Sequence, residues 1–254
     1  MVPLLHFPVV TVSSDIVFII VDEDVSDTVY PNMSSCAPGT SSSGDGCNLR
    51  AAMLFCESFL SIPGRECIIS LPPMGHLFLD PVRGEMRMDL ARGVLRIEGN
   101  ECQLSPLPSS TNTSRLFRVA NSAEINDFMF SVSNMTIRGF GSDEWDGGAV
   151  YMESVSVTLD SVFFVNNAGL AGGAVCFHKC KGVRVLSSHF VNNTAASDGG
   201  GMYLSVDNVG FNITSCEFVG NSVIRTAVST IGTGRFIGIY CSYLCDNCII
   251  MVSD

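Results

Sequence analysis

Three carboxylates lie within four positions of one another, at Asp143, Glu144 and Asp146. Closely placed carboxylates can bind calcium, or can act as the acid and the base that cleave a glycosidic bond. Asp160 and Asp198 are two further candidates, but the five carboxylates share no position of the repeat described below. The chain also contains neither a Gly-His-Gly nor an Arg-x-Lys unit of the kind found in polysaccharide-cleaving enzymes. The pattern favours a solvated acidic loop, with a catalytic or calcium site as the alternative.

Histidine and cysteine supply two other candidate chemistries. His178 and His189 are the histidines nearest the repeat, and neither has a Ser or Cys partner at a spacing that suggests a nucleophile and its base. We interpret both as surface or turn residues. The run Cys241-x-x-x-Cys245-x-x-Cys248 resembles a metal site, but zinc takes four ligands and no fourth is near. Disulfides or stacked thiols are therefore favoured there over zinc.

The chain has 11 cysteines, which is many for a reducing compartment and predicts disulfides in an extracellular protein. An odd total leaves one thiol unpaired if every disulfide is internal, and Cys216 is the candidate. Buried free thiols are the alternative for the N-terminal cysteines. The candidate pairs are Cys36 with Cys47, Cys56 with Cys67, and Cys176 with Cys180.

Asn-x-Ser/Thr sequons also favour secretion, because this motif accepts N-linked glycans in secreted proteins. A repeat rich in Asn, Ser and Thr also produces the motif by chance, so an unmodified asparagine is the alternative at each site. The five sequons start at Asn32, Asn112, Asn134, Asn192 and Asn212.

Composition limits the class of protein. The 254 residues are 46% hydrophobic and 15% charged, which excludes wholesale disorder, and 24 glycines suit short strands joined by turns. The net charge of -11, without any basic run, excludes a nucleic-acid partner. The apolar run Ile16–Val21 is too short to cross a bilayer, so we expect no transmembrane segment. Residues 1–21 also lack the basic start and cleavage site of a signal peptide, so export is unconventional or the sequence is part of a longer protein.

A repeat between Gly147 and Asn221 must position any functional side chains. Each copy runs a Gly-Gly pair into apolar residues and closes on Phe-x-x-Asn, and the Gly-Gly pairs recur after 25 and 27 residues. A period of this size with drifting spacing is typical of stacked solenoid coils. The recurring Phe and Asn predict a stacked aromatic column and a ladder of side-chain amides. The column is Phe164, Phe190 and Phe218, and the ladder is Asn167, Asn193 and Asn221.

The repeat predicts an all-β solenoid of parallel strands. Alignment of the copies places Val157, Val183 and Phe211 in one core column. Residues of about 47–60 carry apolar positions at helical spacing, with Asp45 as a candidate N-cap, and predict an amphipathic helix that caps the first coil. We expect an N-terminal strand and polar loop at 1–45, then one β-helix domain at 46–254 with its clearest coils at 128–221.

Two motifs carry a family resemblance. The stretch Cys47-Asn48-Leu49-Arg50-Ala51-Ala52 resembles the Cys-Ser-Leu-Arg-Glu-Ala motif that opens many secreted parallel β-helix domains. The repeats resemble the Gly-Gly-Ala-Ile and Phe-x-x-Asn units of the polymorphic outer membrane proteins, although Gly199-Gly200-Gly201-Met202 departs at the alanine. The resemblance covers roughly residues 47–221. It implies a right-handed parallel β-helix of the pectin-lyase-like class, used for surface adhesion rather than catalysis.

We therefore expect a non-catalytic protein, secreted or displayed on the cell surface, that mediates adhesion or binds carbohydrate. Its partners would be extracellular carbohydrate or a cell-surface protein, without a cofactor. The alternative is a calcium-dependent polysaccharide lyase or a related carbohydrate-active enzyme. Since the Phe, Asn and Gly columns are explained by stacking and turning, function should lie in segments that vary between copies, at 143–146, 178–181 and 194–198.

Overall fold

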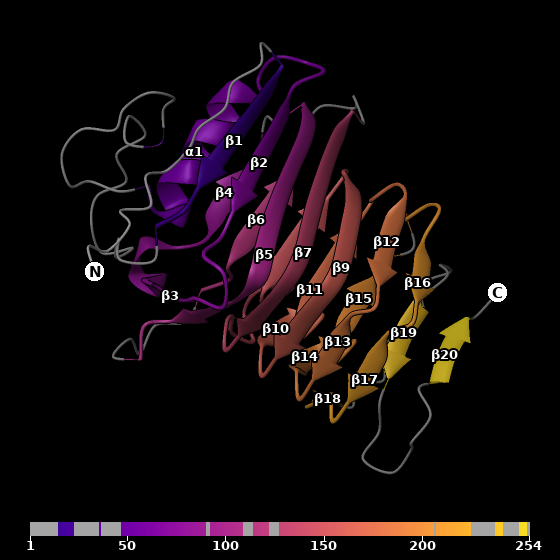
Figure 1. Ribbon diagram of the computed structural model, residues 1–254. Helices are drawn as coiled ribbons and strands as arrows, with labels where there is room; N and C mark the ends of the chain where they lie inside the picture. Colours follow the sequence, from indigo (N-terminus) through magenta and orange to yellow (C-terminus); the bar gives the residue numbers. More distant parts are fainter. Residues whose placement is uncertain are drawn as a thin grey trace.

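The computed structural model describes residues 15–22, 36, 47–89, 92–108, 114–121, 127–205 and 207–224, and the backbone of two later strands. The chain winds into a stack of coils in which strands of successive coils lie side by side (Figure 1). Strands of successive coils pair in parallel, one repeat apart, as where Val157 lies opposite Val183. Two late pairs, which align Tyr203 with Gly238 and Gly238 with Met251, are antiparallel. The expected parallel β-solenoid is confirmed.

The largest sheet has ten strands. Its main path runs β1-β2-β5-β7-β9-β12-β16, and β3, β13 and β17 pair beside this path. The strands are β1 (Ile16–Ile20), β2 (Glu66–Ser70), β3 (His76–Leu79), β5 (Gly93–Pro106), β7 (Phe128–Arg138), β9 (Ser156–Val165), β12 (Val183–Leu186), β13 (His189–Val191), β16 (Asn212–Thr214) and β17 (Glu217–Val219).

Two smaller sheets form the other sides of the stack, and the three-stranded one belongs to the later coils. The seven-stranded sheet has the order β20-β19-β15-β11-β8-β6-β4, and the three-stranded sheet has the order β10-β14-β18. The seven strands are β4 (Met86–Met88), β6 (Phe117–Ala120), β8 (Val150–Glu153), β11 (Val175–His178), β15 (Met202–Leu204), β19 (Ile237–Tyr240) and β20 (Ile249–Val252). The three are β10 (Ala168–Ala171), β14 (Thr194–Asp198) and β18 (Ser222–Val223). A short 3-10 helix, η2 (Pro81–Arg83), precedes β4.

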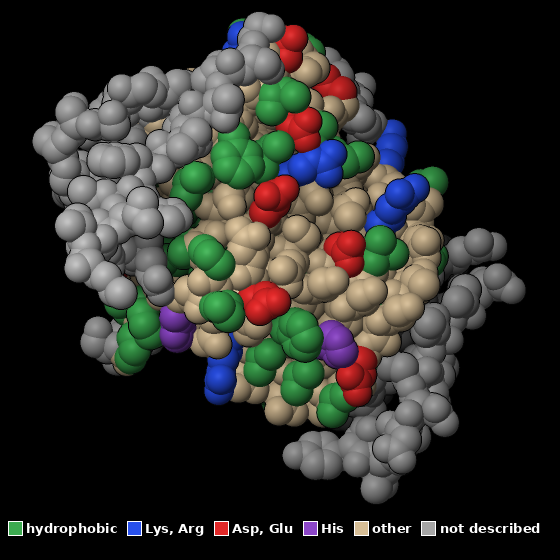
Figure 2. Space-filling view, in the orientation of Figure 1, with side chains coloured by type: hydrophobic (Ala, Val, Ile, Leu, Met, Phe, Trp, Pro, Cys, Tyr) green, Lys and Arg blue, Asp and Glu red, His purple; other side chains and the backbone are tan. Residues whose placement is uncertain are grey.

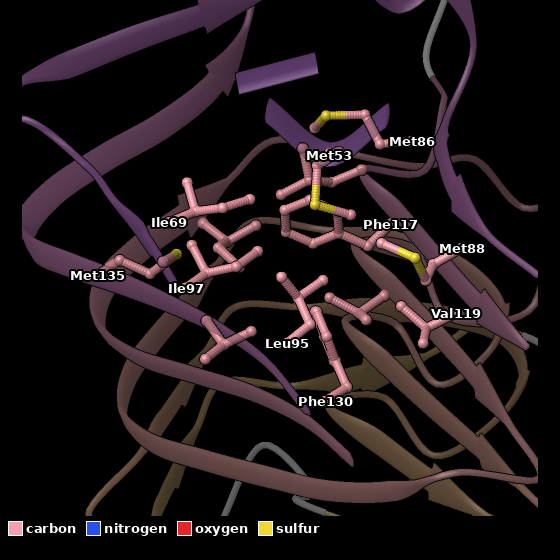
Figure 3. Packing of buried hydrophobic residues seen from close by; sticks show 14 of the residues in the cluster. Met53, Ile69, Met86, Met88, Leu95, Ile97, Phe117, Val119, Phe130 and Met135 are labelled. Carbon is pink, nitrogen blue, oxygen red and sulfur yellow. The ribbon is translucent and has the colours of Figure 1, made fainter. Parts of the chain in front are cut away.

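The hydrophobic core lies between the sheets. Figure 3 shows Met53, Ile69 and Phe117, from the helix and from two sheets, pointing toward one another. Further along the stack, the Phe164 and Phe190 ring centroids are 5.0 Å apart, and those of Phe190 and Phe218 are 4.6 Å apart. Stacked rings of this kind contribute packing and buried area together.

The core becomes more open in the last described coil. The sequence places Phe211 in a buried column, but the structure leaves its side chain 44% exposed, so this prediction is wrong. Phe218 is only partly buried. The reason is positional: β16, which follows Phe211, is the last strand of the main path, and within the described residues it pairs with β12 on one side only.

Helix α1 (Leu49–Phe59) lies at the N-terminal end of the stack, where it contacts β2 and β4 (Figure 1). Two disulfides hold this region, Cys36 to Cys47 and Cys56 to Cys67, and the second joins α1 to β2. The predicted cap, Asp45, lies outside the described residues. The Asn48 side chain is the one that accepts a hydrogen bond from the Ala51 backbone N–H, at 2.8 Å.

The Asn48 cap can be tested directly. Asn48→Ala removes the acceptor for one of the unpaired N–H groups of the first helical turn, and should lower the free energy of unfolding by about 1 kcal/mol. Asn48→Ser keeps a side-chain oxygen at this position and should lose less. Urea unfolding followed by circular dichroism measures both; equal losses would contradict the capping role.

Candidate functional site

The outer face of the seven-stranded sheet gathers polar and aromatic side chains from successive coils. Residues alternate inward and outward along each strand, and the register aligns one outward residue from each of five strands. We call this surface the tyrosine face. Its aligned residues, from β4 to β15, are Arg87, Arg118, Tyr151, Cys176 and Tyr203.

Arg115 lies beside Tyr151 of this face and is held by contacts with several residues. It precedes β6, and only 7% of its surface is exposed. Its Nε donates to Glu85 Oε2 at 2.7 Å, and its Nη1 donates to the Asp146 carbonyl oxygen at 2.5 Å. Its Cζ lies 5.0 Å from the centre of the Tyr151 ring. Contacts from the coils on either side therefore fix the guanidinium in position.

An open hollow of about 170 Å³ lies over this guanidinium. Arg87 contributes to its wall and also donates from Nε to Glu85 Oε1 at 3.0 Å. Trp145, the only tryptophan of the chain, stands at the hollow with 53% of its surface exposed. The Trp145 carbonyl accepts a hydrogen bond from the Leu170 N–H at 2.8 Å, which holds its turn against β10. The hollow is lined by Gly84, Glu85, Arg87, Ser114, Arg115 and Trp145.

Ionisable groups around the hollow are kept in defined states. Burial raises the pKa of the Tyr151 hydroxyl, and the nearby Glu153 carboxylate raises it further. The neutral Tyr151 hydroxyl donates to Glu153 Oε2 at 3.2 Å. Burial also raises the pKa of the Cys176 thiol, with Asp146 as the next cause. Cys176 therefore stays protonated at neutral pH and is a poor nucleophile.

The structure brings only one of the predicted carboxylates into this site. Asp146 contributes its backbone carbonyl to Arg115, while its Oδ1 accepts from the Ala171 N–H at 3.1 Å. Asp143 and Glu144 are exposed in the adjoining turn. Asp160 is on β9 in the other large sheet, and Asp198 ends β14. Within the described residues, no group of three or more His, Cys, Asp or Glu could hold a metal ion.

The two predicted histidines lie on different sheets. His178 ends β11, on the seven-stranded sheet. His189 begins β13, where its Nδ1 lies 2.9 Å from Glu217 Oε2 and its ring stacks on Phe163 with centroids 4.4 Å apart. Neither histidine lines the hollow.

One predicted disulfide is wrong, because Cys176 and Cys180 are both free thiols. Cys176 is aligned with outward-facing Tyr151 and Tyr203, whereas the Cys180 Sγ donates to the Met152 carbonyl oxygen at 3.4 Å. Burial raises the pKa of Cys180 to about 11. Cys102 and Cys216 are also free. Cys241, Cys245, Cys248, Asn32 and Asn112 lie outside the described residues.

Sequence reasoning pointed to the variable segment 143–146, which contains Trp145, but missed the other residues that build the hollow, Glu85 and Arg115 among them. Glu85, Arg115 and Trp145 stand in separate segments, and the first two precede the recognisable repeat. The available signal was spacing: Glu85 and Arg115 are 30 residues apart, and Arg115 and Asp146 are 31 apart, which is about one coil in each case. This spacing could be used only if the alignment between the early coils were known, and these coils repeat too poorly to be aligned by sequence.

Comparisons of the chain with protein-family models, with curated proteins and with solved structures give no significant match. In the described part of the chain, no helix has the length and apolar character required to span a bilayer.

Proposed function

We propose that this protein is a non-catalytic carbohydrate-binding β-solenoid, secreted or displayed at the cell surface, that uses the tyrosine face for adhesion. The observation that carries the proposal is the hollow at Arg115, where a fixed guanidinium lies beside an exposed tryptophan. An aromatic ring offers an apolar face to the C–H groups of a sugar, and the polar groups around it can bond to hydroxyls. Both are present on one rigid surface.

The charge balance favours a neutral sugar over an acidic one. The guanidiniums of Arg87 and Arg115 share the Glu85 carboxylate, and Arg118 Nη1 donates to Asp89 Oδ1 at 2.6 Å. Cations already paired in this way attract a further anion weakly. The hollow is also smaller than sites that enclose drug-sized ligands, which are about 300 to 1,000 Å³. A single neutral sugar ring of a longer chain is the proposed occupant.

Two details of the fold belong to the same proposal. We infer a right-handed coil, the hand that connections between parallel strands of one sheet almost always adopt. Helix α1 would serve as the cap that shields the first coil, because Met53 and Cys56 on its buried face are almost fully covered. The two disulfides support an extracellular location. The pectin-lyase-like and polymorphic outer membrane protein resemblance remains a proposal on the motifs alone.

The test is binding of neutral oligosaccharides to the full chain, measured by glycan array and then by calorimetry. Trp145→Ala should weaken the binding of the best oligosaccharide at least tenfold, since about 1.4 kcal/mol of lost contact corresponds to that factor. Phe211→Ala is the matched control, because it removes an exposed aromatic ring at the last coil of the ten-stranded sheet and should leave affinity unchanged.

Two results would contradict the proposal. If the Trp145→Ala and Phe211→Ala proteins bind the oligosaccharide with equal affinity, the sugar does not bind at the hollow beside Trp145. Release of unsaturated products from acidic polysaccharides, abolished by a calcium chelator, would show the lyase activity that is the alternative expectation. Parallel assays with and without calcium therefore accompany the binding measurements.

A further inference from the structure

The outer face of the ten-stranded sheet carries an apolar patch. The hollow at Arg115 lies on a different sheet, the seven-stranded one. Val165, Val191 and Val219 lie side by side on β9, β13 and β17. Val219 is 46% exposed and the neighbouring Phe163 is 43% exposed. Figure 2 shows hydrophobic side chains gathered beside a histidine on the lower part of this face. We call Phe163, Val165, Val191 and Val219 the valine patch.

The stacking of His189 on Phe163, with an interplanar angle of 4°, keeps the Phe163 ring in place at the patch. Glu217 in turn holds His189 through the hydrogen bond to Nδ1. The Phe163 ring is therefore held at a fixed place beside the valines. Contiguous exposed apolar side chains are a surface on which another apolar group can pack.

Asn192 stands at the border of the valine patch. It directly follows Val191, its side chain is exposed, and it begins the sequon Asn192-Asn193-Thr194. Its counterpart in the next coil is Gly220, and Asn192 Oδ1 occupies the space where a side chain on Gly220 would begin. The Asn192 side chain thus lies over Gly220 of the next coil, the residue that follows Val219.

The distribution of asparagines supports a modified Asn192. Of the adjacent pair, the buried Asn193 is committed to hydrogen bonds, and the exposed Asn192 is the residue at the acceptor position. The other two described sequon asparagines, Asn134 and Asn212, are also exposed, and they lie on β7 and β16 of the same ten-stranded sheet. The described residues of the tyrosine face include no sequon asparagine, so glycans would leave the proposed binding surface free.

We propose that Asn192 carries an N-linked glycan whose first sugars cover the valine patch. The donor is a lipid-linked oligosaccharide diphosphate. Asn192 Nδ2 forms a bond to C1 of the first sugar and loses a proton, while the bond from C1 to the diphosphate oxygen breaks and the lipid diphosphate leaves with the electron pair. The apolar face of that sugar then packs against the valines. This inference rests on the extracellular location proposed above.

Secretion of the full chain from a eukaryotic host, behind a supplied signal peptide, tests the modification. Peptides are deglycosylated enzymatically in heavy-oxygen water, which converts a glycosylated asparagine to labelled aspartate. We expect the label at Asn192 in most of the secreted protein. An unlabelled Asn192 overturns the proposal, whether or not Asn134 and Asn212 carry label.

The cover is tested by binding of an apolar fluorescent dye. Asn192→Gly copies the residue that Gly220 supplies in the next coil, so the backbone is retained while the glycan is lost. Dye fluorescence should rise severalfold in Asn192→Gly and return to the wild-type level in Asn192→Gly/Phe163→Ser. Unchanged fluorescence in Asn192→Gly overturns the covering role. Oligosaccharide binding is also measured on Asn192→Gly. This separates failure of the proposed sugar site at Arg115 from failure of the proposed glycan at Asn192.

Discussion

Replacing Gly173 with alanine is expected to prevent the solenoid from forming, or to lower its free energy of unfolding by more than about 4 kcal/mol, a loss at the extreme for single substitutions. Gly173 is the second glycine of the middle Gly-Gly pair. A Cβ there would overlap the carbonyl oxygen of Gly200 in the next coil and would lie 2.7 Å from the backbone N and C of Thr194. These neighbours are backbone atoms, so no rotamer change can relieve the overlap.

The surrounding hydrogen bonds make a backbone shift costly as well. The Gly173 N–H donates to the Gly199 carbonyl at 3.0 Å, and the Ala174 N–H donates to the Gly201 carbonyl at 2.9 Å. Moving Gly173 away from Gly200 would lengthen both bonds and separate two coils. Soluble yield, circular dichroism and urea unfolding of Gly173→Ala measure the effect.

Gly201→Ala is the matched control, two residues beyond the start of the third Gly-Gly pair. The first two coils already have Ala149 and Ala174 at this position, both fully buried. A Cβ on Gly201 would lie 3.2 Å from side-chain atoms of Asn221 and Phe218 and 3.3 Å from the Phe190 Cβ, a tight contact that involves no backbone carbonyl. We expect a change within about 1 kcal/mol of wild type, because reduced freedom of the unfolded chain offsets the tight contact. If Gly173→Ala and Gly201→Ala lose the same free energy of unfolding, the close approach of the backbone at Gly173 is not what makes its glycine necessary.

The coil architecture could be predicted because its cause is local and repeated. A Gly-Gly pair followed by alternating apolar residues recurs at nearly constant spacing. Each copy therefore predicts the same alternation of inward-facing and outward-facing side chains. The helix was predictable for a similar reason, although its cap at Asn48 was assigned to Asp45. Periodicity does not report how many neighbours a coil has, and for this reason Phe211 was placed in the core.

The candidate site could not be predicted, because it depends on register between coils that do not resemble one another. Arg115 meets Glu85 on one side and the Asp146 carbonyl on the other only after the chain completes a coil in each direction. The sequence instead drew attention to adjacent carboxylates, of which Asp143 and Glu144 are exposed in a turn. Adjacent cysteines misled in the same way, since Cys176 and Cys180 make separate contacts despite their small separation.

Asn193→Ala is expected to lower the free energy of unfolding by about 3 to 5 kcal/mol, since each buried polar group left unpaired costs about 1 to 3 kcal/mol. The Asn193 side chain is fully buried. Its Oδ1 accepts from the Asn167 backbone N–H at 2.9 Å and from Asn167 Nδ2 at 3.0 Å. Its Nδ2 donates to the Phe164 carbonyl and to Asn221 Oδ1, both at 2.9 Å. Alanine removes the acceptor of the buried Asn167 N–H and one donor to the Phe164 carbonyl, while Asn167 Nδ2 and Asn221 Oδ1 each keep one other bond.

Two further variants separate hydrogen bonding from loss of volume. Asn192→Gly, at the exposed neighbour, should change the free energy of unfolding by less than about 1 kcal/mol when both the variant and the wild type are unglycosylated.

Asn193→Asp keeps the size but places a carboxylate against the acceptors on Phe164 and Asn221, so the folded-state pKa of this carboxyl should rise above the unfolded value of about 3.9. A raised folded pKa gives stability that is present at low pH and lost as pH rises. Asn193→Asp should therefore approach wild-type stability below about pH 4 and lose it toward neutral pH in urea unfolding series, whereas the deficit of Asn193→Ala should not depend on pH. A pH-independent deficit in Asn193→Asp would show that packing, and not the amide ladder, holds these coils together.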